Sequence, residues 1–267
     1  MSFFLGNIFV VIFAKNTNNN FIIPVLIASI IPIINFLLVF FYLPETKPNS
    51  DSNKSTTILK NPLKELFTVF KEEKIKKLSL AFFIYFIAFT GLTNILIFFL
   101  QESLNWTTKA SSGTLVVVGI IAIIVQGGLI GPLVKQFGEM RLTLIGSGFI
   151  LVACALLITA PKENATINIY SAVSFLAVGA GLITPTLRAL ISKKLDVDKQ
   201  GSILSNLQGL QSLGGVLGIA MAGRVYDSFG PKAPFIAGSV ILLFMIDLIA
   251  EGKNNNSFNN QDSKVPS

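Results

Sequence analysis

The sequence predicts an all-α membrane protein, and three observations lead to this prediction. The chain has 267 residues and contains seven apolar stretches of about 18 to 26 residues, which hold only two formal charges, Arg188 and Asp247. About 20 apolar residues cross a hydrocarbon layer of ~30 Å, and soluble domains do not repeat uncharged runs of that length. Charged residues make up 13% of the chain, well below the roughly 25% of soluble domains. The apolar runs are continuous rather than alternating, which favours helices over a β-barrel.

We expect the seven stretches to be transmembrane helices. In chain order they are residues 21–42, 78–100, 112–134, 142–160, 167–192, 202–223 and 233–250. A shorter apolar run at 3–14 precedes them and has only about twelve residues, too few to span. It has two interpretations: the end of a helix that began earlier, or a signal peptide. No basic segment precedes it and no small-residue cleavage site follows, which favours the first.

The distribution of Lys and Arg predicts the orientation of these spans. Fifteen of these residues fall in loops 44–77, 135–141 and 193–201 and in the tail after 250. Only five fall in the alternate loops: Lys15, Lys109, Lys162, Arg224 and Lys232. Because loops rich in Lys and Arg stay on the inner side, we expect the first span to end in the cytoplasm. The C-terminus is then cytoplasmic too, in a cell or inner membrane.

Four segments follow from this reading. Residues 1–43 hold the short run and one span, 44–77 a cytoplasmic linker, 78–250 a six-helix bundle, and 251–267 an Asn- and Ser-rich tail expected to be disordered. The second part of the linker is amphipathic, with apolar residues at helical spacing: Leu59, Leu63, Leu66, Phe67 and Phe70. Such a helix can lie on the membrane surface; it is either a linker helix between two halves or a lipid sensor.

Composition excludes several classes of function. The chain has no histidine and one cysteine, Cys154, which removes His-based acid–base catalysis, His or Cys metal sites and intrachain disulfides. No GxxxxGK[ST] loop is present, so ATP hydrolysis is not expected. The net charge of +7 follows membrane topology and not a nucleic-acid surface, because the lysines gather in alternate loops. We therefore expect no enzyme, no cofactor, no metal and no nucleic-acid partner.

Three stretches of the sequence carry a family resemblance. They are residues 41–46, which end in Leu43-Pro44-Glu45-Thr46, residues 127–141, and residues 185–192 with 200–201 and 211–215. In that order they resemble the sixth helix entering the central loop, the cytoplasmic turn between helices eight and nine, and helices ten and eleven of major facilitator superfamily transporters. Within this family they resemble most the drug:proton antiporter branch that includes tetracycline-efflux proteins. The stretches occur in the family's order, and the resemblance covers about residues 3–250.

The resemblance implies the six-helix C-terminal bundle of the major facilitator fold, plus the preceding helix and linker. Family members have twelve helices in two halves, with the substrate near the midplane between them. This chain begins where the fifth helix would end, and of the antiporter motif expected there only Leu5-Gly6-Asn7 stands in the sequence. The expectation is a truncated or split transporter whose partner is an N-terminal half or a second copy of the chain.

Polar residues within the spans are the candidates for a substrate cavity, because such groups are costly in lipid. Tyr85, Phe89, Thr93 and Asn94 share roughly one helix face and mix aromatic with hydrogen-bonding groups, which suits a small amphipathic organic substrate. The other candidates are Gln126, Thr184 beside the helix-bending Pro185, Gln208, Gln211 and Ser212. The alternative for each is a hydrogen bond that ties helix to helix.

The resemblance also implies a gating loop, whose candidates are Gly131, Lys135, Gly138 and Arg141. Charge pairs there, with Glu139, would stabilise an outward-open state; the alternative is positive-inside anchoring. Arg188 and Asp247 are the candidates for ion coupling. Arg188 can extend to the interface or pair with an acidic group across the gate.

Two hypotheses about function follow. The first is a secondary transporter, coupled to protons, that moves a small organic compound outward. The second is a non-transporting membrane subunit or degenerate half that acts through a partner. An intramembrane enzyme is disfavoured because the spans hold no histidine and no paired carboxylates.

Overall fold

The computed structural model describes residues 22–42, 66–161 and 165–262. The apolar run at 3–14 and the linker residues Leu59 and Leu63 lie outside the described residues. The chain divides into two compact units, 1–62 and 63–267, and each is considered by itself. The described part of the first unit is one helix, α2 (Ile22–Tyr42), with Pro32 inside it. It covers the first predicted span.

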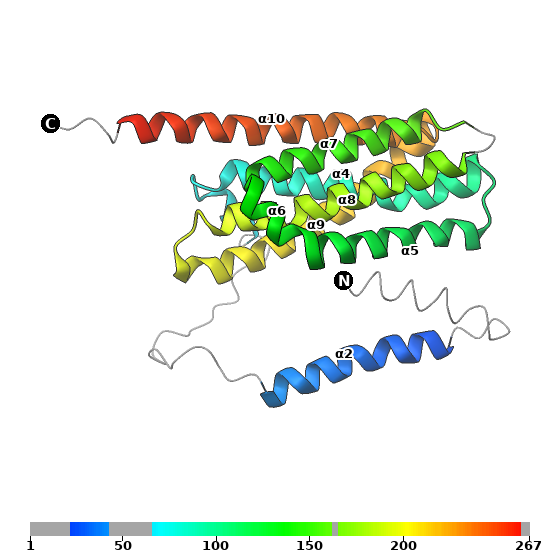
Figure 1. Ribbon diagram of the computed structural model, residues 1–267, viewed down its shortest axis with the longest axis horizontal. Coiled ribbons are helices and arrows are strands. Elements are labelled where there is room, and N and C mark those ends of the chain that lie inside the picture. Colours follow the sequence, from blue (N-terminus) through cyan, green and yellow to red (C-terminus); the bar gives the residue numbers. More distant parts are fainter. Residues whose placement is uncertain (1–21, 43–65, 162–164, 263–267) are drawn as a thin grey trace. The chain divides into compact units, whose positions relative to one another are not determined.

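The second unit is a helical bundle (Figure 1). A short 3₁₀ helix, η1 (Phe67–Phe70), leads into α4 (Lys76–Ser103). The helices α5 (Thr108–Ile124), η2 (Val125–Leu129) and α6 (Ile130–Phe137) then run on without a break. They are followed by α7 (Glu139–Ile158), α8 (Thr166–Ser192), α9 (Val197–Phe229) and α10 (Ala233–Asp262). Figure 1 shows the long helices of this unit with their axes roughly aligned.

The prediction of an all-α membrane protein is confirmed. Within the described residues, five helices are long and apolar enough to cross a membrane: 76–103, 110–137, 139–158, 166–192 and 233–250. The helix α9 is long enough but is not among them, because Ser, Asn and Gln residues at 202–212 lower its mean hydropathy. It is also longer than the predicted span 202–223. Helix α10 continues to Asp262, where the sequence led us to expect a disordered tail.

The core of the bundle is built on α4. Its side chains Phe82, Tyr85 and Phe99 are fully or almost fully buried, since α9 packs along one side of α4 and α10 along another. The helices α7 and α8 form the other closely packed pair. Glycine allows these approaches: a Cβ on Gly218 of α9 would lie 2.2 Å from the carbonyl oxygen of Ile87 on α4. Burial therefore orders α9 and α10 around α4, and α7 against α8.

The end of the linker is tied to the start of α9. Asn206 Nδ2 donates to Thr68 Oγ1 at 3.2 Å, and Lys199 Nζ lies 3.4 Å from Glu72 Oε2. In the described part of the linker, the amphipathic helix expected from the sequence is one turn of 3₁₀ helix with Val69 buried. Phe67 stays 47% exposed.

Candidate functional site

Helices α4, α8 and α9 bring six side chains together, and we refer to them as the α4–α8–α9 cluster. Its members come from three separate stretches of sequence and combine aromatic rings, hydroxyls, amides and one cation. They are Phe82, Tyr85, Thr184, Arg188, Gln208 and Gln211. Five of the six are named above as candidates from the sequence; the sixth, Phe82, was not predicted.

Arg188 is the charged centre of the cluster. Its Nη2 donates to Gln208 Oε1 at 2.7 Å and also to Gln211 Oε1. The guanidinium carbon lies 5.9 Å from the centroid of the Phe82 ring, within the range of a cation–π contact. Its Nε is buried and has no hydrogen-bond partner in the described part of the chain. Arg188 therefore bonds neutral amides on α9, where the sequence suggested either the interface or an acidic partner.

The two amide side chains of the cluster come from one face of α9. Gln208 and Gln211 are three residues apart, so they lie on neighbouring positions of one helix face. Gln208 is exposed and Gln211 half-buried in this unit. Ser212 lies on the same side of α9, where its Oγ donates to the Gln208 carbonyl of its own helix at 3.1 Å. This part of the cluster is thus open at the surface of the unit.

Tyr85 forms the aromatic side of the cluster. It is fully buried, and its hydroxyl lies 3.3 Å from Thr184 Oγ1 on α8. Its ring stacks on Phe89 with 5.5 Å between centroids. Thr186, two residues after Thr184, contacts a different helix. Its Oγ1 lies 2.9 Å from the Oγ1 of Thr143 on α7. The two threonines that flank Pro185 therefore link α8 to α4 and to α7.

Several candidate residues are not brought into the cluster. Thr93 Oγ1 and Asn94 Nδ2 both donate to carbonyls of their own helix, and Asn94 is exposed. Gln126 is exposed on η2, a short π-helical segment. Such segments interrupt α-helices, frequently at functional sites. Asp247 is exposed on α10 and forms no hydrogen bond with another described residue.

In the loop predicted as a gate, Gly138 has a defined backbone role. With φ +76° it joins α6 to α7 in a conformation that favours glycine. Gly131, Lys135 and Arg141 are exposed.

Glu139 pairs with Lys193, at the end of α8. The sequence analysis did not name Lys193 as a candidate. Its position directly after a predicted span could have indicated it, because cations are favourable at the C-terminal end of a helix. The next residue, Lys194, is partly buried, which lowers its pKa below the ordinary lysine value.

The arrangement suits binding rather than covalent chemistry. An aromatic wall stands beside amide and hydroxyl groups, and a guanidinium keeps a donor without a partner. Such a mixture fixes the orientation of a ligand that is partly apolar and partly polar. Four members of the cluster belong to α4 and α8, two of the membrane-length apolar helices, where each polar atom left unpaired raises the free energy.

Comparisons with known proteins agree with this architecture. The family model of the Major Facilitator Superfamily matches residues 1–219. The class H tetracycline resistance protein of Pasteurella multocida is 24% identical over 76% of this chain and 50% of its own length. The class C protein of Escherichia coli is 24% identical over 58% of this chain and 39% of its own length.

A solved structure gives the same fold. The human organic anion transporter MFSD10 (TETRAN) superimposes with a TM-score of 0.68 at 20% identity, over 83% of this chain and 55% of that protein. This chain spans about half the length of the relatives it matches or less. The resemblance to the family and the six-helix fold predicted from it are confirmed, and the protein is a multi-pass integral membrane protein. The chain belongs to the major facilitator superfamily.

Proposed function

We propose that this chain forms one half of the cavity wall of a secondary transporter, and that the α4–α8–α9 cluster binds the transported compound. The observation that carries the proposal is the placement of Arg188 among Gln208, Gln211 and Phe82. A cation held in an apolar span by neutral amides alone keeps its charge uncompensated, which is unfavourable unless a further polar group approaches. A bound substrate is such a group.

The chemistry of the cluster indicates a small amphipathic organic compound. Phe89 is half-buried and stacks on the buried Tyr85, so it offers a ring face, and Gln208 offers an exposed amide. Relatives named for tetracycline resistance and for organic anion transport are consistent with such cargo. We propose efflux coupled to protons, with the proton carried by a group outside the cluster, because the cluster contains no carboxylate. Asp247 on α10 and residues of another half are the candidates.

We further propose that the loops before α4 and after α6 and α8 face the cytoplasm, together with the C-terminus. The excess of Lys and Arg in these loops supports this orientation. In it, the Glu139–Lys193 pair stands at the cytoplasmic ends of α7 and α8. Breaking that pair would loosen the cytoplasmic side, as a gating role requires.

The test is proton flux in proteoliposomes that contain the full chain with any chain that co-purifies from the host membrane. A pH-sensitive dye inside the vesicles reports proton movement when tetracycline or an organic-anion dye is added. We expect a substrate-induced signal that falls at least about tenfold in Gln208→Ala. The matched control is Thr159→Ala, since the Thr159 hydroxyl bonds only carbonyls of its own helix.

The second hypothesis, a non-transporting subunit, predicts a different result in the same preparation. A partner chain would co-purify, and neither probe would move protons in wild type or variants. Binding of a probe without flux would support this reading, and flux that survives Gln208→Ala unchanged would contradict the assignment of the cluster.

A further inference from the structure

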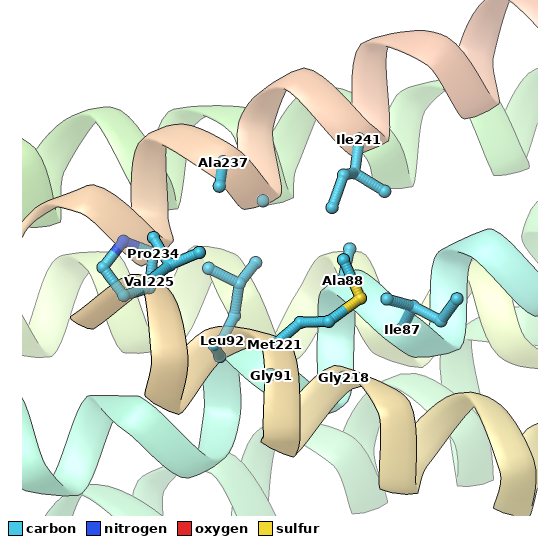
Figure 2. Close-up of a pocket in the computed structure, with 12 residues that line it drawn as sticks. Ile87, Ala88, Gly91, Leu92, Gly218, Met221, Val225, Pro234, Ala237 and Ile241 are labelled. Carbon is cyan, nitrogen blue, oxygen red and sulfur yellow. The ribbon is translucent and has the colours of Figure 1, made fainter. Parts of the chain in front are cut away.

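An apolar groove lies between α9 and α10, over the middle of α4. Both helices rest on α4 and leave a space of about 330 Å³ between them, including its open mouth. Figure 2 shows Ala237 and Ile241 of α10 on one side and Met221 of α9 with Ala88 and Leu92 of α4 on the other. None of the twelve lining residues carries a polar side chain.

The groove follows from small residues at the helix contacts. A Cβ on Gly91 would lie 2.8 Å from the Gly218 carbonyl oxygen, so α4 and α9 touch backbone to backbone. A Cβ on Gly238 would lie 2.8 Å from Leu92, so α10 rests directly on the side chain of that residue. With α9 and α10 both drawn onto α4 in this way, the space between them stays open along the surface. Met221, in its wall, is 48% exposed.

The groove runs from the middle of α4 toward the ends of the helices that carry few basic residues. On α9 it extends from Gly218 to Val225, and on α10 from Pro234 to Ile241. Seven residues of helix correspond to about 10 Å, which is part of one leaflet. An apolar space open to the hydrocarbon region is not filled by water, which needs polar partners there. A hydrocarbon chain is the matching occupant.

Two cations lie close to the groove in the sequence, near the end of α9 and in the turn before α10. Arg224 is adjacent to the lining residue Val225, and Lys232 precedes Pro234 by two positions. Both are exposed, and neither forms an ion pair with another described residue. Of the carboxylates at this end, Glu102 accepts a hydrogen bond from Tyr226 at 2.7 Å, and Asp227 is exposed. Arg224 and Lys232 are also two of the few basic residues placed against the positive-inside pattern.

We propose that this groove is a binding site for one phospholipid of the surrounding bilayer. One acyl chain lies between α9 and α10, and the phosphate contacts Arg224 and Lys232. Charge-assisted hydrogen bonds from Arg and Lys to phosphate oxygens are favourable at a low dielectric constant. Because Asp227 and Glu102 offset the two cations, the site takes phospholipids by phosphate and chain, without a preference for a net negative headgroup.

Native mass spectrometry of the full chain, released from membranes in mild detergent, tests this site. We expect one phospholipid to stay bound to the wild type. Ala237→Leu fills the groove and lowers the retained fraction several-fold. Ala220→Leu adds the same three carbons at an exposed position of α9 outside the groove lining and leaves retention unchanged. Arg224→Ala with Lys232→Ala also lowers retention, whereas Lys74→Ala, an exposed cation in the linker, does not.

Three results overturn the proposal. The first is equal retention in the wild type and Ala237→Leu, provided that the thermal unfolding midpoints agree. The second is retention of phosphatidylglycerol but not of phosphatidylethanolamine in mixed nanodiscs, which would indicate surface charge alone. The third is release of a co-purified protein chain by Ala237→Leu with lipid retention unchanged, which would make the groove a protein interface.

Discussion

Arg188 on α8 donates a hydrogen bond of 2.7 Å to Gln208 on α9, twenty residues further along the chain. This bond joins two helices that otherwise contact each other little, because each packs mainly against a different neighbour. It therefore crosses the space between the α7–α8 pair and the α4–α9 pair. A side chain that approaches Arg188 or Gln208 from outside the bundle would alter this link directly.

The first prediction concerns the guanidinium. Arg188→Gln removes the charge and the shared donor to Gln208 and Gln211, and we expect substrate binding to fall about tenfold or more, since a hydrogen bond to a charged group contributes roughly 1.5–3 kcal/mol. Arg188→Lys keeps the charge but not the planar fork, so it should restore binding only in part. The measurement is the substrate concentration for half-maximal proton flux.

The matched control for this experiment is Lys74→Gln, which removes an exposed cation from the turn before α4. It should leave the half-maximal concentration unchanged. If Arg188→Gln behaves like the control, Arg188 does not contact the substrate.

A second prediction concerns the contact between α4 and α9. Gly218→Ala places a methyl group 2.2 Å from the Ile87 carbonyl oxygen, so backbone must move. We expect a loss of about 1–3 kcal/mol in the free energy of unfolding. Gly223→Ala is on the same helix with no atom within 4 Å of the new Cβ, and it should be neutral or stabilising by up to about 1 kcal/mol. Unfolding by SDS in mixed micelles measures both; equal effects would contradict the close approach.

The buried hydroxyl pair of α7 and α8 gives a third prediction. Thr143 and Thr186 are each at most 1% exposed, and their Oγ1 atoms lie 2.9 Å apart. In a double-mutant cycle with Thr143→Val and Thr186→Val, the coupling free energy should be about 0.6 kcal/mol, the average for hydrogen bonds between membrane helices. The value is modest because each hydroxyl has one hydrogen, and the hydroxyl that donates across the pair gives up the carbonyl of its own helix. Strictly additive single effects would show that the pair contributes nothing.

The fourth prediction concerns Glu139 and Lys193. The lysine side chain is 67% exposed, so the pair should contribute less than about 1 kcal/mol and should weaken as salt is added. Glu139→Lys should lower the thermal midpoint, and the exchanged pair Glu139→Lys with Lys193→Glu should recover most of that loss. Failure of the exchanged pair to recover would mean that the two side chains do not interact in the membrane.

The sequence was sufficient to predict the helical spans, because length and apolarity decide membrane insertion locally. It also singled out Tyr85 and Gln208 as polar candidates, since a polar side chain in lipid needs a partner wherever that partner comes from. It did not predict which partner. Arg188 bonds amides because α9 brings Gln208 and Gln211 to it, and Glu139 meets Lys193 because Gly138 turns the chain between α6 and α7. Those pairings depend on tertiary packing, which is not encoded in any short window of residues.

The sequence pattern also did not predict where α9 and α10 end. Both helices continue past the apolar stretch that predicted them, into residues whose polarity ended the predicted spans. Hydrophobicity locates the part of a helix that lies in lipid, whereas the hydrogen-bonded backbone extends further. The groove between these helices likewise depends on the spacing of Gly91, Gly218 and Gly238 across three helices.

The most direct test of the account is the path of α9, the polar helix that supplies Gln208 and Gln211. In a Cys154→Ala background, single cysteines are placed at Asp196, before its first residue, and at Phe229, its last. A membrane-impermeant maleimide added to intact cells should label Phe229→Cys and should label Asp196→Cys only after the membrane is opened. Equal labelling of both positions from outside would mean that α9 does not cross the bilayer, and it would contradict both the cluster and the function assigned to it.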